Sequence, residues 1–451
     1  MTFLPAQSGD CFISMLPEEP HRSEHGTFPT VQQLVHEGWG LEKNYTEPRG
    51  ENVGDMIAFL GSSSGTTGLP KAIAVPHRSV IAVSMQMTAH YKANEKGLSD
   101  EDRWIRPGDL VLGVLPFFHV YGLVAILHTL CYSGAGIVVV PQFSLEPCLK
   151  TIVTRLITHL PTFPSLVPSI IVLLVNVHNT ASKKYDLSHC RWVVSGGAPL
   201  SSTLLTQLRA RLPGARIGLA YGMTETTGLV CMGDFHKPCP EDSAGYLLPD
   251  TMVRIVKADG TTAESCEPGE IWVQGPQNTL GYTNDKKATE ETFLPDGWVR
   301  TGDEGYVKSD GSVFIIDRLK ELIKVRAFQV APAEREAHLL EHPSVQDTGV
   351  IGVPDEYKGE IPLAFVVLDE PTTKRAASSR QEEMKVKQEL TKWVSDQKVR
   401  YKWLDGGIEF VDSIPKSPSG KILRRLLRDR AKPVLEKKDQ KDQRAGEIAK
   451  L

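Results

Sequence analysis

The feature that most constrains the fold is a long uncharged stretch in the first third of the chain. No Lys, Arg, Asp or Glu occurs between Leu110 and Leu145, and a helix of that length could span a membrane. Gly and Pro residues divide the stretch into the apolar run VLGVLP, a helical segment over residues 120–132 and the run GIVVVP. Short continuous apolar runs are typical of strands buried on both faces of a parallel sheet. The stretch therefore predicts strand, helix and strand at the centre of an α/β sheet, and no integral membrane segment.

The pattern of expected helices and strands in the rest of the chain predicts two domains. Strands and helices alternate from Met56 to about residue 220, which favours a helix-covered sheet. Short strands follow from about 250 to 316, with Asp310-Gly311 at a hairpin turn. A smaller, charge-rich segment with an α+β pattern follows Asp317. We predict an α/β fold with a large domain over residues 1–317 and a small α+β domain over residues 318–451.

Residues 1–50 carry only one short candidate helix, after Thr30. The expected helices further along are residues 146–160, 165–177, 201–212, 333–341 and 381–397, and the expected strands include residues 192–194 and 217–220.

Charge and cysteine usage exclude several classes of protein. The chain has 451 residues, with 51 Lys and Arg against 55 Asp and Glu. This balance supplies no field that would hold nucleic acid over the whole surface, so we expect no nucleic-acid partner. The 7 cysteines are odd in number and form no CxxC pair, which argues against a disulfide framework or a zinc site.

A run of small and hydroxyl residues carries the strongest local signal. The sequence from Ser62 to Lys71 reads SSSGTTGLPK and follows an apolar strand-like segment. Small residues let backbone N–H groups approach an anion, hydroxyls add donors, and the lysine adds a cation. The run is not a Walker A loop, because Lys71 follows a proline and precedes an alanine. It predicts a phosphate-binding loop; the alternative is a surface turn.

The run resembles the phosphate loop of the adenylate-forming superfamily, which includes acyl-CoA synthetases, 4-coumarate–CoA ligases and beetle luciferases. Four more motifs follow in the family's order: YGMTE from Tyr221, TGD from Thr301, DRLKELIK from Asp317 and PKSPSGK from Pro415. Five ordered matches over residues 56–428 make chance agreement negligible. The resemblance is closest to the 4-coumarate–CoA ligase-like and luciferase-like branch.

The resemblance implies sites for ATP and CoA. Tyr221 would stack on adenine, Asp303 would accept the ribose hydroxyls, and Arg318 would contact ribose or phosphate. The residues expected to contact these two substrates are Ser63, Ser64, Gly65, Thr66, Thr67, Gly68, Lys71, Ala220, Tyr221, Gly222, Thr224, Asp303, Arg318, Lys324, Arg326, Ala327 and Lys421.

The resemblance also assigns the catalytic roles. Thr224 and Glu225 would meet the α-phosphate, with Glu225 as a ligand of Mg²⁺, which prefers hard oxygen ligands. Lys421 would stabilise the negative charge that develops when a carboxylate attacks the α-phosphorus. Lys320 occupies the hinge position about which the small domain rotates between two arrangements. Taken alone, YGMTE could be a capped helix start.

The acyl site is predicted less sharply. The residues implied to bind the acid substrate or to line its pocket are His119, Tyr121, Gly196, Gly197, Leu219 and Gln329. A histidine with apolar neighbours is commonly a satisfied core residue, and that alternative stands for His119. Leu219-Ala220 replaces a Gln-Gly pair of 4-coumarate–CoA ligases, so we expect an acid other than 4-coumarate. Arg326-Ala327 replaces Lys-Gly near the CoA tunnel, which makes thioester formation a weaker inference than adenylation.

The expected function is an ATP- and Mg²⁺-dependent acid–thiol ligase that converts an aryl or fatty acid, through acyl-AMP, to acyl-CoA. In the family the phosphate loop lies well inside the chain, whereas here it begins at Ser62. Compared with the family, we therefore expect roughly a hundred or more residues of the first α/β subdomain to be missing. Two alternatives follow: a non-catalytic nucleotide-binding relative, and an adenylating enzyme with a different second step.

The last three residues, Ala449-Lys450-Leu451, are a conservative variant of the Ser-Lys-Leu peroxisomal address. They predict a peroxisomal location and an import receptor as a partner, with the cytoplasm as the alternative.

Overall fold

The computed structural model describes residues 22–23, 26–27, 36–39, 49–50, 52–63, 71–140, 143–162, 175, 184–196, 202–326, 328–355, 357–417 and 420–433. The chain forms two compact units, Met1–Gly54 and Asp55–Leu451. In the first, β1 (Arg22–Ser23) and β2 (Gly26–Thr27) pair as a short antiparallel ladder. The helix predicted after Thr30 lies outside the described residues.

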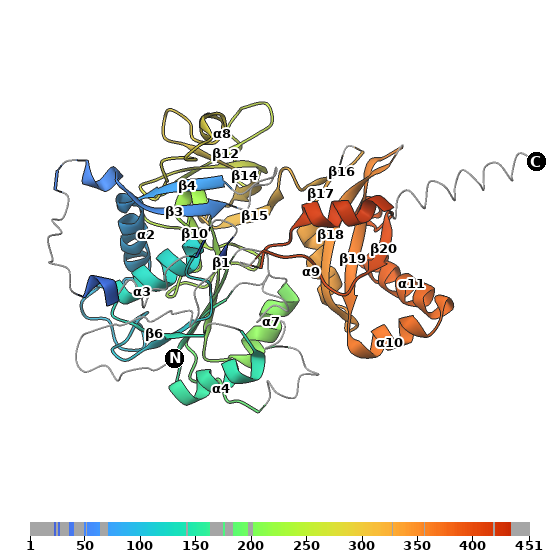
Figure 1. Cartoon of the computed structure of the whole chain (residues 1–451), viewed down its shortest axis with the longest axis horizontal. Coiled ribbons are helices and arrows are strands. Elements are labelled where there is room, and N and C mark those ends of the chain that lie inside the picture. Colours follow the sequence, from blue (N-terminus) through green and yellow to red (C-terminus); the bar gives the residue numbers. More distant parts are fainter. Residues whose placement is uncertain are drawn as a thin grey trace, which may run out of the picture. The chain divides into compact units, whose positions relative to one another are not determined.

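The second unit begins with a hairpin on which the phosphate loop is built. A 3₁₀ turn, η1 (Val53–Asp55), precedes strand β3 (Ile57–Ser63), which pairs antiparallel with β4 (Lys71–Pro76). Ser63 lies opposite Lys71, so the two ends of the loop meet side by side. Helix α2 (His77–His90) follows directly, as Figure 1 shows.

A seven-stranded sheet forms the centre of this unit, in the order β11-β10-β9-β8-β7-β5-β6. Five strands are parallel, and β10 and β11 add antiparallel at one edge. The strands are β5 (Leu110–Gly113), β6 (Gly136–Val139), β7 (His159–Thr162), β8 (Trp192–Gly196), β9 (Arg216–Tyr221), β10 (Cys231–Met232) and β11 (Tyr246–Leu247). The strand–helix–strand prediction for the uncharged stretch is confirmed, because β5 and β6 are neighbours.

The helices of this region differ from the predictions in one respect. The uncharged stretch holds η2, a π-helical segment (Tyr121–His128), which continues as α3 (Thr129–Tyr132); α4 (Leu145–Arg155) and α7 (Ser202–Arg211) follow. The helix predicted over residues 146–160 was too long. It ends at Arg155 because Leu156 adopts a left-handed conformation with φ of 53°, and His159 then begins β7. Of the helix predicted over residues 165–177, only Val175 is described.

A four-stranded antiparallel sheet follows, with its strands in chain order. It contains β12 (Met252–Val256), β13 (Gly269–Gln274), β14 (Val299–Val307) and β15 (Val313–Arg318), with α8 (Lys286–Thr292) between β13 and β14. The hairpin predicted at Asp310-Gly311 is confirmed: Gly311 has a φ of 83°, which favours glycine.

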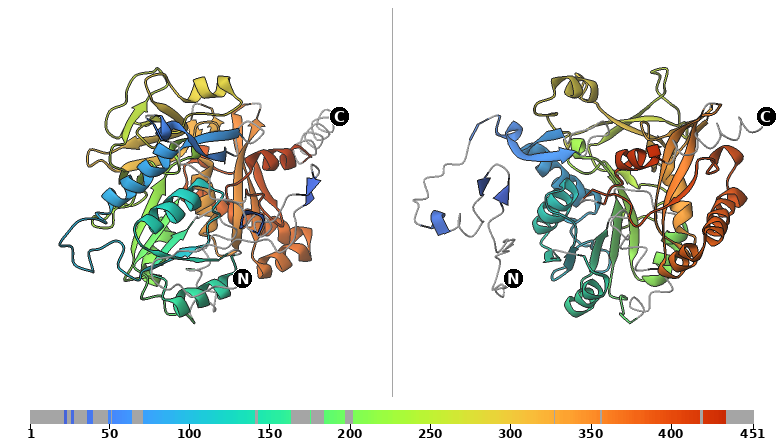
Figure 2. Two further views of the ribbon diagram at one scale, coloured as in Figure 1. Left: turned by 60° about the vertical axis from the view of Figure 1, so that its left-hand side comes forward. Right: turned by 45° about the vertical axis from the view of Figure 1, so that its right-hand side comes forward.

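The C-terminal part is α+β, as predicted. Its sheet has the order β17-β16-β19-β18, and β20 pairs parallel with β19. Helices α10 and α11 pack together beside these strands, on their outer side in the right-hand view of Figure 2. The elements are β16 (Ile323–Val325), β17 (Phe328–Val330), α9 (Pro332–Leu340), β18 (Val345–Asp355), β19 (Gly359–Leu368), α10 (Glu370–Ser378), α11 (Arg380–Gln397), η4 (Arg400–Lys402), β20 (Gly407–Phe410) and a helix over residues 424–433.

The buried apolar side chains form separate cores in the two parts. The largest cluster contains Ile73, Val111, Leu160 and Val193 from the seven-stranded sheet and its helices. The clusters after residue 317 contain other residues, including Val350 and Leu390. The domain boundary at Asp317 stays a prediction. Among the described residues, no helix has the length and apolar character needed to cross a membrane.

Candidate active site

Tyr221, Asp303 and Arg318 meet where two sheets adjoin. Tyr221 ends β9, and its hydroxyl donates a hydrogen bond of 2.7 Å to Oδ2 of Asp303 on β14. Arg318 ends β15 directly opposite Asp303, and its Nε lies 3.4 Å from Oδ1 of that carboxylate. Burial raises the pKa of Asp303, and the nearby Arg318 opposes this shift. The structure thus brings together the three residues predicted to hold the adenosine.

Lys421 joins this group from the far end of the chain. Burial lowers the pKa of its ammonium group to about 8; Arg318 adds to the shift, and the carboxylates of Glu321, Asp303 and Glu225 oppose it. The ammonium group is therefore largely buried near the residues predicted to contact the α-phosphate and is not fully exposed to solvent. The predicted catalytic lysine and the predicted metal carboxylate therefore share one electrostatic environment.

A short, internally bonded loop presents Lys421. The backbone N–H of Ser417 donates to the carbonyl of Lys421 at 2.8 Å, and the Ser417 hydroxyl accepts from the Lys421 N–H at 3.1 Å. Gly420 has a φ of 85°, so the turn favours a glycine there. At the base of the loop, Lys416 forms a buried ion pair of 2.8 Å with Asp347 on β18. These contacts explain why the PKSPSGK sequence holds its last lysine in place.

The chain that follows the loop is bonded to the turn in which a hinge is predicted. Arg424 makes two hydrogen bonds of 2.8 Å to the carboxylate of Glu336 on α9 and one of 2.9 Å to Glu321. Glu321 directly follows Lys320, the predicted hinge residue, which lies in a turn between β15 and β16. The segment that carries Lys421 is therefore anchored beside the predicted hinge residue.

Glu225 and Thr224 lie in the 3₁₀ turn η3 (Thr224–Thr226), directly after β9. Glu225 is only 6% exposed, and its Oε1 accepts a hydrogen bond of 2.8 Å from the hydroxyl of Tyr282. A Cβ on Gly61 would lie 2.9 Å from Cγ2 of Thr224, so glycine allows β3 to approach this turn. The buried carboxylate has the chemistry that suits Mg²⁺.

The phosphate loop is described only at its two ends. Residues 64–70, which include the predicted Ser64, Gly65, Thr66, Thr67 and Gly68, lie outside the described residues. Lys71 is described: its Nζ lies 3.1 Å from Oδ2 of Asp285 and 4.8 Å from the centre of the Tyr282 ring. Lys71 and Glu225 thus contact the same segment of chain.

The predicted acyl-site residues that the structure describes lie in or near four elements, η2, β8, β9 and β17. His119 precedes η2; burial lowers its pKa, and the charge of Lys421 lowers it further. Gly196 ends β8 beside Ala220, where a Cβ would lie 3.1 Å from the Ala220 carbonyl oxygen. Leu219 is half-buried on β9. Gly197 lies outside the described residues.

Tyr121 is 4% exposed and belongs to the large apolar core. Its backbone N–H donates to Nδ1 of His119 at 3.3 Å. In this structure Tyr121 therefore supports the position of His119 from within the core.

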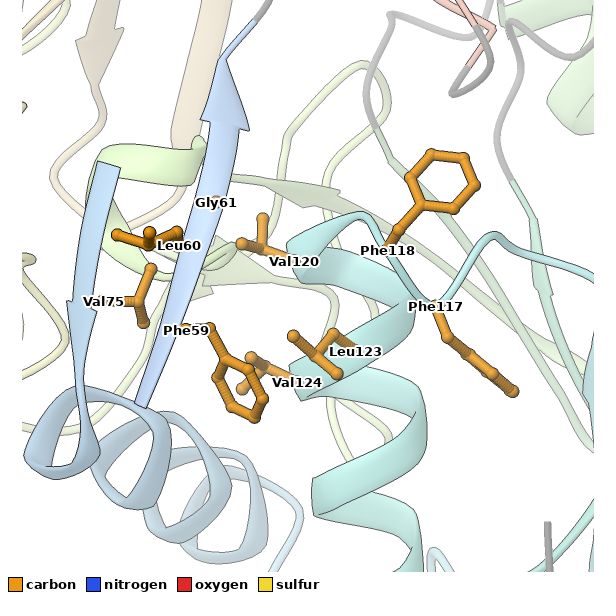
Figure 3. Close-up of a pocket in the computed structure, with 9 residues that line it drawn as sticks. All are labelled: Phe59, Leu60, Gly61, Val75, Phe117, Phe118, Val120, Leu123 and Val124. Atoms are coloured by element: carbon orange, nitrogen blue, oxygen red, sulfur yellow. The ribbon is translucent and has the colours of Figure 1, made fainter. Parts of the chain in front are cut away.

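A separate apolar pocket of about 250 Å³ lies between β3 and η2. Figure 3 shows side chains of Phe59 and Val75 facing those of Leu123 and Val124, with Phe117 and Phe118 at one side. Leu60, Gly61 and Val120 complete its lining. The predicted acyl-site residues are not among these nine, although Gly61 also touches the Thr224 turn.

The residues predicted to meet CoA lie on the β16–β17 hairpin. Lys324 pairs with Gln329 across this hairpin, and the Lys324 N–H donates to Glu360 at 2.8 Å. Arg326 occupies the turn with a φ of 56°. Ala327 lies outside the described residues. The hairpin gathers Lys324, Arg326 and Gln329 in one exposed place, separate in sequence from the Lys421 loop.

Sequence reasoning missed three residues that the geometry joins to the site. Tyr282 and Asp285 follow a strand in the sequence GYTND, and Arg424 follows Lys421 in GKILR. The Gly-Tyr pair and the arginine, which is always charged, are visible in the sequence. Neither one by itself indicates a phosphate-binding site.

Two models of known protein families match this chain. Residues 12–283 match the family model for AMP-binding enzymes, and residues 334–421 match the model for the C-terminal domain of AMP-binding enzymes. The acyl-CoA ligase lcsD of Purpureocillium lilacinum is 38% identical over 82% of this chain and 92% of its own.

Two further relatives are longer than this chain. 4-Coumarate–CoA ligase 5 of Oryza sativa subsp. japonica is 41% identical over 83% of this chain, which spans 65% of that ligase. The structure of o-succinylbenzoate CoA synthetase from Bacillus subtilis, in complex with ATP and a magnesium ion, is 29% identical. It aligns with a TM-score of 0.66 over 83% of this chain and 70% of that one.

Proposed function

Because the chain belongs to the family of AMP-binding enzymes, we propose that it is an ATP-dependent acid–thiol ligase. It would adenylate a carboxylic acid and pass the acyl group to CoA. One observation carries the proposal: the buried Lys421 ammonium lies within electrostatic range of Glu225 and of Asp303, which is hydrogen-bonded to Tyr221, although these residues come from three distant motifs. The names of the relatives, an acyl-CoA ligase and a 4-coumarate–CoA ligase, support the same class of reaction.

In the first step a carboxylate oxygen attacks the α-phosphorus of ATP, and the bond to the β-phosphate oxygen breaks to release pyrophosphate. The product is acyl-AMP. Lys421 is the cation placed to stabilise the charge that grows on the α-phosphoryl oxygens, which lowers the barrier more than it tightens ground-state binding. Tyr221, Asp303 and Arg318 orient the adenosine and hold the phosphorus in line with its attacker.

A magnesium ion fits beside Glu225. The carboxylate is a hard oxygen ligand, it is buried, and it accepts a hydrogen bond from Tyr282. When bound, the ion would neutralise charge on the phosphates. The related o-succinylbenzoate CoA synthetase was solved with ATP and magnesium ion, which supports this assignment.

In the second step the thiol sulfur of CoA attacks the acyl carbonyl carbon of acyl-AMP. The bond to the phosphate oxygen breaks, the thiol proton is lost, and acyl-CoA and AMP are the products. The exposed Lys324 and Arg326 on the β16–β17 hairpin are the residues we assign to CoA. The acid is an aryl or fatty acid other than 4-coumarate, because Leu219-Ala220 gives an apolar, narrowed strand end.

The test is carboxylate-dependent release of pyrophosphate from ATP over a panel of aryl and fatty acids, with and without CoA. The proposal expects release that depends on the acid, and acyl-CoA formation when CoA is present. Release without acyl-CoA would support adenylation followed by another acceptor. No release from folded protein would favour a non-catalytic nucleotide-binding relative.

The peroxisomal address at Ala449-Lys450-Leu451 lies outside the described residues and is also part of the proposal. Localisation of the tagged full-length chain, with and without Leu451, tests it.

A further inference from the structure

Residues 279–285 connect two motifs that lie far apart in the sequence. Leu280 and Gly281 exchange hydrogen bonds of 3.0 and 2.9 Å with Ala74 on β4, the strand that leaves the phosphate loop. Thr279 donates a bond of 3.0 Å to the backbone carbonyl of Glu225. The segment is therefore joined by its backbone to both β4 and the η3 turn.

The side chains of the same segment reach the charged groups of both motifs. The Tyr282 hydroxyl donates to Oε1 of Glu225 at 2.8 Å, and the Tyr282 ring lies 4.8 Å from Nζ of Lys71. Asp285, which caps α8 by accepting from the Ala288 N–H, lies 3.1 Å from the same Nζ. One short segment thus contacts both the Glu225 carboxylate and Lys71, the last residue of the predicted phosphate loop.

The Tyr282 ring is fixed in place. It packs edge-to-face on Phe293 with ring centres 5.8 Å apart, and its backbone N–H donates to the Thr289 hydroxyl at 3.0 Å. The fixed ring holds the phenolic oxygen beside Glu225, to which the hydroxyl donates. A carboxylate held by a donor in this way loses little rotational freedom when it takes up a ligand.

We propose that Tyr282 is a positioning residue, which orients the Glu225 carboxylate for the divalent metal that accompanies ATP. This inference rests on the proposed function, because it assumes a metal–nucleotide complex at Glu225. Hydrogen-bonded partners of metal ligands contribute about 10–100-fold to metal affinity or activity. Tyr282 should therefore act on metal-dependent nucleotide binding more than on the nucleotide itself.

The test replaces Tyr282 by Phe, which removes the hydroxyl and keeps the ring on Phe293. The readout is equilibrium binding of Mn²⁺ to the full chain in the presence of ATP, followed by the paramagnetic resonance signal of free Mn²⁺. We expect Mn²⁺ affinity to fall by about 10-fold or more, while binding of ATP in the presence of a metal chelator changes by less than about 2-fold. The apparent Mg²⁺ requirement for pyrophosphate release should rise, with kcat recovered at saturating Mg²⁺.

A matched control is Tyr246→Phe, which removes a hydroxyl bonded to the Pro238 carbonyl at 3.4 Å. It should leave Mn²⁺ affinity unchanged, and thermal unfolding of both variants checks the fold. Equal Mn²⁺ affinity in wild type and Tyr282→Phe would overturn the inference but not the proposed function. A wild-type chain that binds no ATP would overturn both.

Discussion

At the scale of single residues, the ammonium group of Lys421 decides how the proposed first step responds to pH. Burial lowers its pKa to about 8, and only the protonated form can stabilise the developing charge. We expect kcat/KM for pyrophosphate release to fall as pH rises above about 8, approaching tenfold per pH unit. Lys421→Arg keeps its charge at these pH values, so its profile should stay flat to higher pH. A wild-type profile that is level up to pH 10 would contradict this assignment.

Removal of the same side chain tests its contribution to the rate. Lys421→Ala should slow adenylate formation by about 10²–10³-fold, the usual cost of losing one electrostatic contact to a transition state. Affinity for ATP should change far less, because Tyr221, Asp303 and Arg318 remain. Single-turnover pyrophosphate release and equilibrium ATP binding measure the two quantities. Lys432→Ala, on an exposed side chain of the C-terminal helix, serves as the control.

At the scale of elements, the Lys421 loop, the hinge turn and α9 are held together by Arg424. Its side chain is buried between Glu336 and Glu321. Arg424→Ala leaves the buried Glu336 carboxylate without its cation and should lower the free energy of unfolding by about 3–5 kcal/mol. Urea denaturation measures the loss.

The double variant Arg424→Met with Glu336→Leu provides the comparison, because replacing a buried ion pair by apolar groups is often close to neutral. It should recover most of the lost stability. If the double variant is no more stable than Arg424→Ala, the cost arises from the bond to Glu321 or from packing, and not from the uncompensated Glu336 charge.

Elements whose own residues form a distinctive pattern could be predicted from the sequence. Contacts between residues far apart in the sequence could not. The uncharged stretch after Leu110 predicts β5 and β6 because buried strands have a distinctive composition. The end of α4 was misplaced because a single left-handed residue, Leu156, breaks it without Gly or Pro. Tyr282 and Arg424 escaped prediction for another reason: their carboxylate partners lie 57 and 88 residues away, and no local pattern reports such contacts.

At the scale of the whole molecule, the proposed function requires one site to serve two reactions. Lys421 belongs to the C-terminal part, yet it shares its surroundings with Asp303 and Glu225 from the large part. Under the proposed function, this arrangement would serve adenylation. The predicted CoA residues Lys324 and Arg326 lie on a separate hairpin of the same part, formed by β16 and β17. Thioester formation would therefore need this part to turn, so that the hairpin replaces the lysine loop.

Lys320 is the residue about which such a rotation would occur. Substitution by proline tests this directly, because it restricts the backbone at that position. The neighbouring turn is held by bonds of 2.9 Å from the Leu319 N–H to Gly302 and from the Glu321 N–H to Arg318. Proline fixes φ near −65°, so Lys320→Pro should hold one arrangement. We expect acyl-AMP formation to stay within a few-fold of wild type, and conversion of purified acyl-AMP and CoA to acyl-CoA to fall on the order of 100-fold, as for misplaced reactants.

The two half-reactions must be measured separately, with Lys320→Ala as the control, because alanine removes the side chain and leaves the backbone free to rotate. The alanine variant should support both half-reactions. Equal losses of both in the proline variant would indicate damage to the site, and two unaffected half-reactions would place the hinge elsewhere. Loss of the second half-reaction alone is the result that only a rotation at this position explains, because the Lys421 site would be intact while the CoA hairpin could not reach it.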